Sequence, residues 1–118
     1  MKIALVQFHR ENNFVYYFLS EHIRLFYHAF LDLGLDVVID TRPHRDRVNV
    51  LFSLMQAVTS EKNYDWSQYD YVVYQPEILS QKGVNNLPDL LSPLESQQIL
   101  KTYLRVLAQA RMVWEVFP

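Results

Sequence analysis

The feature that most constrains the fold is an alternation of short apolar runs with longer segments of helical periodicity. Residues 2–8 are almost continuously apolar, and residues 35–40 repeat this pattern. Strands covered by helices on both faces have such sequences, because neither face meets water. Between the two runs, residues 14–33 carry apolar side chains at helical spacing. These segments predict a β-α-β unit in which Gly34 is the left-handed residue that ends the helix.

Four further elements continue the alternation, in the order helix, strand, helix, strand: residues 48–58, 69–75, 92–111 and 112–117. The start of the third of these is the best defined, because Ser92 and Glu95 form a capping box with Pro93 at the first helical position. The alternation predicts one three-layer, Rossmann-like α/β domain over residues 1–118, with a short, mainly parallel sheet of about four strands.

Composition limits the classes of partner. The chain is 50% hydrophobic, carries a net charge of −2 and contains no cysteine. A weakly acidic chain has no overall field that attracts nucleic acid or anionic lipid. No apolar stretch approaches the roughly 20 residues that a membrane span needs. The lack of cysteine excludes disulfides, thiolate nucleophiles and zinc–sulfur sites. We therefore expect a cytoplasmic protein without a membrane span, a nucleic-acid partner, a metal or a cofactor.

Polar residues follow the predicted strands, at the edge where ligands of parallel sheets bind. The candidate ligand-binding residues at this edge are His9, Arg10, Asn12, Asn13, Gln75, Glu77 and Glu115. Asn12 or Asn13 has an alternative role as the N-cap of the following helix. Glu115 lies within the apolar run VWEVF, so we expect it to face a cleft or to pair with Arg10 or His9. Catalytic residues stay unassigned, because most paired carboxylates are structural.

A basic segment after the second predicted strand is the candidate anion site. It contains Arg42, His44, Arg45 and Arg47, interrupted by Asp46. Guanidinium groups bind phosphates and carboxylates, although such runs also occur as solvated loops. Asp40 has the position of a ribose-binding acid, but no glycine follows the first strand. The sequence therefore excludes a dinucleotide or P-loop site.

Three segments resemble the N-terminal domain of two-domain, twin-Rossmann (GT-B type) bacterial glycosyltransferases: YDYVVYQPEILS at 69–80, SPLESQQILKTYLRVLAQAR at 92–111 and VWEVFP at 113–118. In this resemblance Gln75 and Glu77 end the third strand, and Trp114 and Glu115 form the Trp–acid pair of the fourth. The segment HRENNF matches the acceptor-side loop. In the family, the sugar nucleotide is held mainly by a C-terminal domain that these 118 residues lack. The resemblance thus implies a truncated, acceptor-side domain without autonomous catalytic activity.

Three classes of function follow. The first is the acceptor-side domain, which binds a sugar or sugar phosphate beside a separate donor-binding domain. The alternative is a flavodoxin-like small-ligand or regulatory module that holds an anion on Arg42, Arg45 and Arg47. The third is a structural interaction protein. In addition we expect a homodimer, formed through the last strand or through the aromatic-rich helix at residues 14–33.

Overall fold

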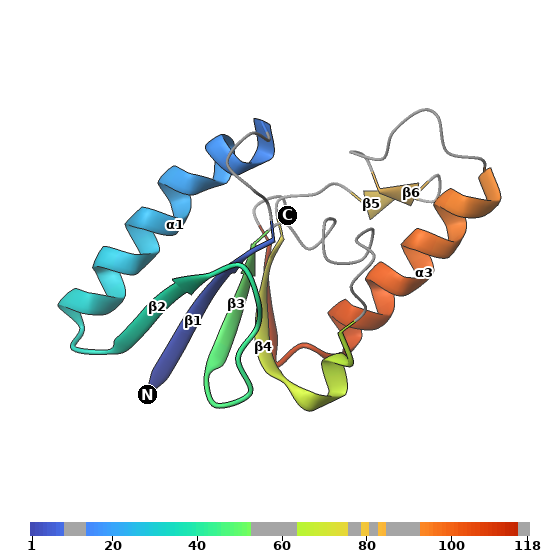
Figure 1. Cartoon of the computed structure of the whole chain (residues 1–118). Coiled ribbons are helices and arrows are strands. Elements are labelled where there is room, and N and C mark those ends of the chain that lie inside the picture. Colours follow the sequence, from blue (N-terminus) through green and yellow to red (C-terminus); the bar gives the residue numbers. More distant parts are fainter. Residues whose placement is uncertain (9–13, 53–63, 76–78, 81–82, 85–92, 116–118) are drawn as a thin grey trace.

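The computed structural model describes residues 1–8, 14–52, 64–75, 79–80, 83–84 and 93–115 (Figure 1). Its centre is a five-stranded, all-parallel sheet in the order β2-β1-β3-β4-β7. The strands are β1 (Lys2–Gln7), β2 (Asp36–Asp40), β3 (Val48–Phe52), β4 (Asp70–Gln75) and β7 (Met112–Glu115). Helices α1 (Phe14–Asp32) and α3 (Pro93–Gln109) lie on opposite faces of this sheet. The predicted three-layer α/β architecture is confirmed.

Smaller elements join the large ones. The 3₁₀ turn η1 (Trp66–Gln68) precedes β4, and Asp65 caps it by accepting a hydrogen bond from the Ser67 N–H. The two-residue strands β5 (Leu79–Ser80) and β6 (Gly83–Val84) pair antiparallel between β4 and α3. This pair lies beside the beginning of α3 (Figure 1).

Each face of the sheet has its own apolar core. On the α1 side, Ile3 and Leu5 of β1 pack with Ile23 of the helix. On the α3 side, Ala4 and Val6 pack with a cluster that includes Tyr103, which is fully buried. Consecutive residues of β1 therefore point into different cores. This is why the strand has an uninterrupted apolar sequence.

The helices begin and end where the sequence predicts. Gly34 follows α1 with a φ of 78°, a left-handed conformation that favours glycine. Helix α3 begins at Pro93. Two leucines that the helical spacing would place on the apolar faces are exposed instead, Leu33 by 72% and Leu104 by 47%. Leu33 lies beyond the last residue of α1, and Val106 occupies the buried position on α3 instead.

The helix predicted for residues 48–58 is wrong in the part that the structure describes. Val48–Phe52 forms β3, which lies between β1 and β4, and residues 53–63 lie outside the described part. Val50 and Phe52 point to the α1 core, while Leu51 points to the α3 core. The polar Asn49 interrupts this apolar run in the way that a solvent-facing residue interrupts an amphipathic helix. Its side chain is nevertheless fully buried in the strand.

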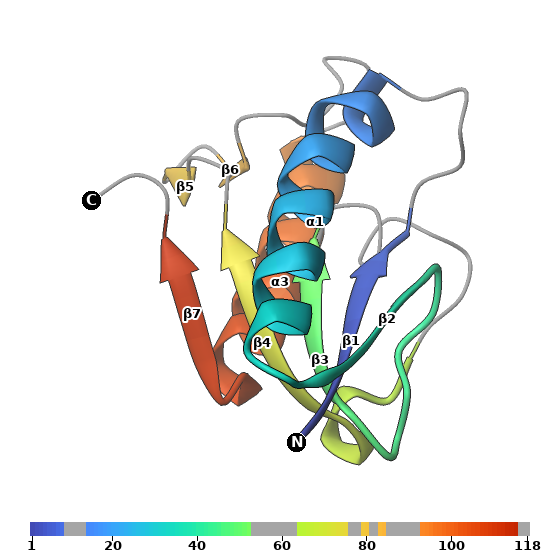
Figure 2. The same ribbon diagram turned by 90° about the vertical axis from the view of Figure 1, so that its left-hand side faces the viewer.

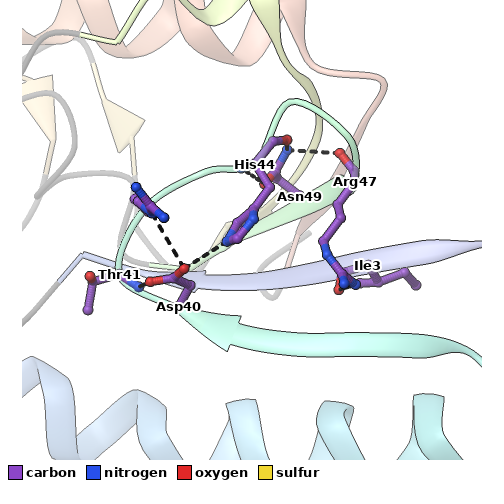
Figure 3. Close-up of polar contacts among 7 residues, drawn as sticks. Ile3, Asp40, Thr41, His44, Arg47 and Asn49 are labelled. Carbon is purple, nitrogen blue, oxygen red and sulfur yellow. Dashed lines mark hydrogen bonds and ion pairs between the residues drawn. The ribbon is translucent and has the colours of Figure 1, made fainter.

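The connection between β2 and β3 is very short. Parallel strands are usually joined by a crossover of a dozen or more residues, whereas residues 41–47 carry the chain from the end of β2, across β1, to the start of β3. This crossover loop lies on the face of the sheet opposite α1 (Figure 3).

The side chain of Asn49 fixes the crossover loop to the sheet. Its Oδ1 accepts the His44 N–H at 2.7 Å. Its Nδ2 lies 2.8 Å from the His44 carbonyl, 3.1 Å from that of Arg47 and 3.0 Å from that of Asp70. One buried amide thus satisfies backbone groups of the loop and of β4, as such groups require.

We expect Asn49→Ala to lower the free energy of unfolding by about 3 kcal/mol, because it leaves several buried backbone groups without partners. Urea denaturation of the purified chain measures this value. The exposed loop residue Asp46 provides the control, and Asp46→Ala should change the free energy by less than about 0.5 kcal/mol. Equal losses in the two variants would contradict the role given to Asn49.

Candidate functional site

The order of the strands places a topological switch point between β1 and β3. From β1 the chain moves to β2 on one side, and from β3 it moves through β4 to β7 on the other. With β7 counted as the fifth strand, this is the flavodoxin-like order 2-1-3-4-5. Ligands of open α/β sheets bind beyond the carboxyl ends of the strands at such a point. The edge formed by the ends of β1, β3, β4 and β7 is therefore the candidate site.

Three amide or carboxylate residues end the strands at this edge. Gln75 and Glu115 are register partners at the last positions of β4 and β7, so the structure brings these two predicted residues together. Gln7 ends β1 and is only 5% exposed. The sequence analysis missed Gln7 because it belongs to an apolar strand. The available signal was a single amide that is separated from HRENN by one residue, Phe8.

The other predicted edge residues are not placed. They lie outside the described residues and are His9, Arg10, Asn12, Asn13 and Glu77. The first four follow β1, and Glu77 follows β4, so the chain path attaches all of them to strand ends at the candidate edge. Their convergence with Gln75 and Glu115 stays a prediction.

An aromatic cluster lies on the α1 face of the sheet, just below this edge. It consists of His22, Phe26, Phe52, Tyr74 and Trp114. The ring of Phe26 stacks on Trp114 with centroids 5.8 Å apart, and the rings of Phe52 and Tyr74 are 5.2 Å apart. These contacts join α1 to the carboxyl halves of three strands, which makes this wall of the site rigid.

Within the aromatic cluster, His22 and Tyr74 share a hydrogen bond. The His22 Nδ1 and the Tyr74 hydroxyl oxygen are 2.9 Å apart. Burial raises the pKa of Tyr74 above the ordinary value of 10.0, so its hydroxyl stays neutral at physiological pH. The cluster therefore presents a neutral hydroxyl and an imidazole. The sequence did not predict this aromatic cluster. The available signal was that Tyr74 and Trp114 directly precede Gln75 and Glu115.

The candidate anion site lies on the crossover loop, and the first three of its four basic side chains already contact other residues of the chain. The His44 Nε2 is 2.7 Å from the Asp40 Oδ2, and the Arg42 Nε is 3.7 Å from the same oxygen (Figure 3). The Arg45 guanidinium lies over the ring of Tyr69, 5.9 Å from its centroid. An anion at this loop has to compete with the Asp40 carboxylate for Arg42 and His44.

Arg47, the fourth basic residue, anchors the other end of the crossover loop. Its Nη1 donates to the Asp36 carboxylate at 2.9 Å and lies 3.3 Å from the Ile3 carbonyl. Asp36 and Asp40 are both on the loop side of β2, because alternate residues of a strand share a face. Arg42, His44 and Arg47 of the basic segment are therefore all in contact with these two acids. The sequence signal for this arrangement was the spacing of the two aspartates at the ends of DVVID, residues 36–40.

Two further classes of site are limited by the described residues. In those residues, no group of three or more histidine, aspartate or glutamate side chains is placed to hold a metal ion. None of the helices in the same part of the chain is both long enough and apolar enough to cross a membrane.

Comparison with known proteins yields no relative: no protein-family model, no curated protein and no solved structure matches the chain.

The charge on Asp40 supports the crossover loop in a pH-dependent way. Burial by itself raises the pKa of Asp40, but the Thr41 backbone N–H, His44 and Arg42 outweigh this effect and hold the pKa below its ordinary value of 3.8. A carboxyl whose pKa is depressed on folding stabilises the native state above its unfolded pKa. That stabilisation is lost as the pH falls through the folded pKa.

We therefore expect Asp40→Asn to be less stable than the unmodified chain at about pH 6, and the difference to shrink as the pH falls below about 3.8. Urea denaturation across this range measures both free energies. Asp32→Asn, at the exposed end of α1, is the matched control, because it removes a carboxyl group that takes no part in the crossover loop. A stability difference for Asp40→Asn that is constant with pH would refute the assignment.

Proposed function

We propose that this domain binds a polyhydroxylated, uncharged ligand, such as a saccharide, at the carboxyl edge of the sheet and does not transform it unaided. The observation that carries the proposal is the position of Gln7, Gln75 and Glu115 at strand ends, along the same edge of the sheet that contains the switch point between β1 and β3. Amide and carboxylate groups exchange hydrogen bonds with hydroxyl groups. They lack the positive charge that phosphate recognition uses.

The size of the edge fits such a ligand. Neighbouring strands are about 4.8 Å apart, so β1 and β7, which are separated by three spacings, lie roughly 14 Å apart. The aromatic cluster closes the α1 side of this edge. Apolar walls with a few polar groups are typical of small-molecule sites.

The resemblance to glycosyltransferase N-terminal domains gives this proposal its specific form. In that form the saccharide is an acceptor, and a separate domain binds the sugar nucleotide. The lack of cysteine fits a reducing compartment, so we place the protein in the cytoplasm.

The second candidate function is an anion-binding regulatory module. The flavodoxin-like strand order and the exposed side chains of Arg42 and Arg45 favour it. Its ligand would lie on the crossover loop instead of at the ends of β4 and β7. The two candidates therefore differ in the residues that respond to ligand.

Two-dimensional ¹H–¹⁵N NMR of the labelled chain tests both candidates with a panel of glucose, maltose, glucose 1-phosphate and inorganic phosphate. We expect a neutral sugar to shift the amide signals of residues 7, 52, 75 and 115. Gln75→Ala should weaken this binding by about tenfold, which corresponds to one lost hydrogen bond to a neutral partner.

Gln109→Ala is the matched control, because Gln109 is exposed at the end of α3 near the amino ends of the strands. Binding by this variant should equal that of the unmodified chain. If only phosphate binds, and only residues 41–47 respond, the regulatory alternative replaces the saccharide site. If no member of the panel shifts the edge signals, or if the chain alone turns over a sugar nucleotide, the proposal fails.

A further inference from the structure

The sheet ends in two edge strands of opposite character. In the described residues, β2 pairs only with β1 and β7 pairs only with β4. An edge strand presents unpaired N–H and C=O groups, so it can pair with a strand of another chain. Charged residues on an edge decide which partner it accepts, because opposite charges across a strand pair attract and like charges repel.

Strand β7 presents an accessible, partly apolar edge. Met112 is 53% exposed, and the side chain of Arg111, which directly precedes the strand, is 56% exposed. Figure 2 shows β7 at the left edge of the sheet, with β4 and the other strands on its right side only. The Trp114 indole N–H lies 2.8 Å from the Met112 sulfur, so both side chains are on the α1 face of this strand.

We infer that two copies of this chain pair their β7 strands antiparallel, around a two-fold axis at Val113. In this register Arg111 of each copy lies opposite Glu115 of the other, Met112 lies opposite Trp114, and Val113 meets its own copy. Both ends of the strand pair then carry an attractive charge pair. At the middle of the strand pair, the Met112 thioether of each copy lies against the Trp114 indole of the other, which is a favourable contact.

Arg111 is able to serve two carboxylates. Within its own chain its Nη2 pairs with Asp70, and its backbone N–H donates to the Tyr71 carbonyl at 2.8 Å. These bonds hold the residue at the start of the strand. A guanidinium has five N–H donors in a fixed plane, so one bond to Asp70 leaves capacity for a carboxylate of the second copy.

The opposite edge of the sheet cannot pair with itself in the same way. A two-fold axis at Val38 of β2 places Asp36 of each copy opposite Asp40 of the other. Each of these carboxylates already contacts a basic residue of its own chain, so this pairing gains no attraction between opposite charges. The charge pattern therefore selects the β7 edge, and the occupant that it fits is a second copy of this chain.

The resulting dimer has one continuous sheet, in which the five strands of each copy meet at β7. Since the β7 strands run antiparallel, the candidate ligand sites of the two copies lie at opposite ends of this sheet. The dimer does not depend on the proposed function, because no ligand takes part in the strand pairing.

Charge exchange tests the register directly. We expect the unmodified chain to have the mass of a dimer in light scattering at micromolar concentration. Arg111→Glu and Glu115→Arg should each raise the dissociation constant by about tenfold or more, because each variant places like charges at both ends. An equimolar mixture of the two variants should form a heterodimer, and the double variant should restore the homodimer. Circular dichroism confirms that each variant folds.

A disulfide test locates the axis. The chain has no cysteine, so Val113→Cys introduces a single thiol that meets its own copy across the axis. Mild oxidation should convert this variant to a covalent dimer. Ile39→Cys, which is 48% exposed on the other edge strand, is the control and should stay largely monomeric.

A monomeric unmodified chain at these concentrations would overturn the inference. So would charge variants that leave the mass unchanged, a mixture that forms no heterodimer, or equal cross-linking at positions 113 and 39. If the β7 edge instead binds a different protein, the unmodified chain would be monomeric in light scattering.

Discussion

The arrangement of the sheet depends on one buried amide. Asn49 holds the ends of the crossover loop through the His44 and Arg47 backbone, and it also bonds the Asp70 carbonyl of β4. A connection this short has little conformational freedom, so the loop has to be fixed while it crosses β1. This fixation supports the pairing of β3 with β1, which creates the reversal of strand order that defines the candidate site.

Each face of the sheet combines aromatic packing with a hydrogen bond of a tyrosine hydroxyl. On the α3 side, the Tyr71 hydroxyl donates to the Val106 carbonyl, and burial raises the pKa of Tyr71 to about 12. On the α1 side, rings from the helix and from three strands pack against one another near the carboxyl edge. The hydrogen bond between Tyr71 and Val106 thus adds to the apolar packing of α3, and the aromatic packing near the carboxyl edge positions α1 and supports the site.

The sequence predicted local structure better than it predicted contacts. Helix α1, its end at Gly34 and the start of α3 at Pro93 follow from periodicity and capping, which are local properties. Strand β3 was predicted as a helix because the partners of Asn49 come from residues as distant as Asp70. Periodicity cannot report such a long-range bond.

The candidate sites show the same division. The sequence placed Gln75 at the end of a strand and Glu115 within one, and their adjacency depends on the register of β4 with β7. The basic segment was recognised by composition alone, whereas its partners Asp36 and Asp40 belong to another element and become visible only when β2 and the loop are in contact. Charge counts along a chain do not show which charges are already neutralised.

The two tryptophans occupy different layers of the molecule. Trp66 is buried in the α3-side core among Tyr64, Tyr69 and Tyr71, while Trp114 stacks on Phe26 at the α1 side. The chain has two tryptophans in all. Each face of the sheet therefore contains its own intrinsic fluorophore, and replacing one tryptophan with phenylalanine leaves an optical reporter for the opposite face. The fluorescence emission of the two single-tryptophan variants therefore reports whether the two layers unfold together or one after the other.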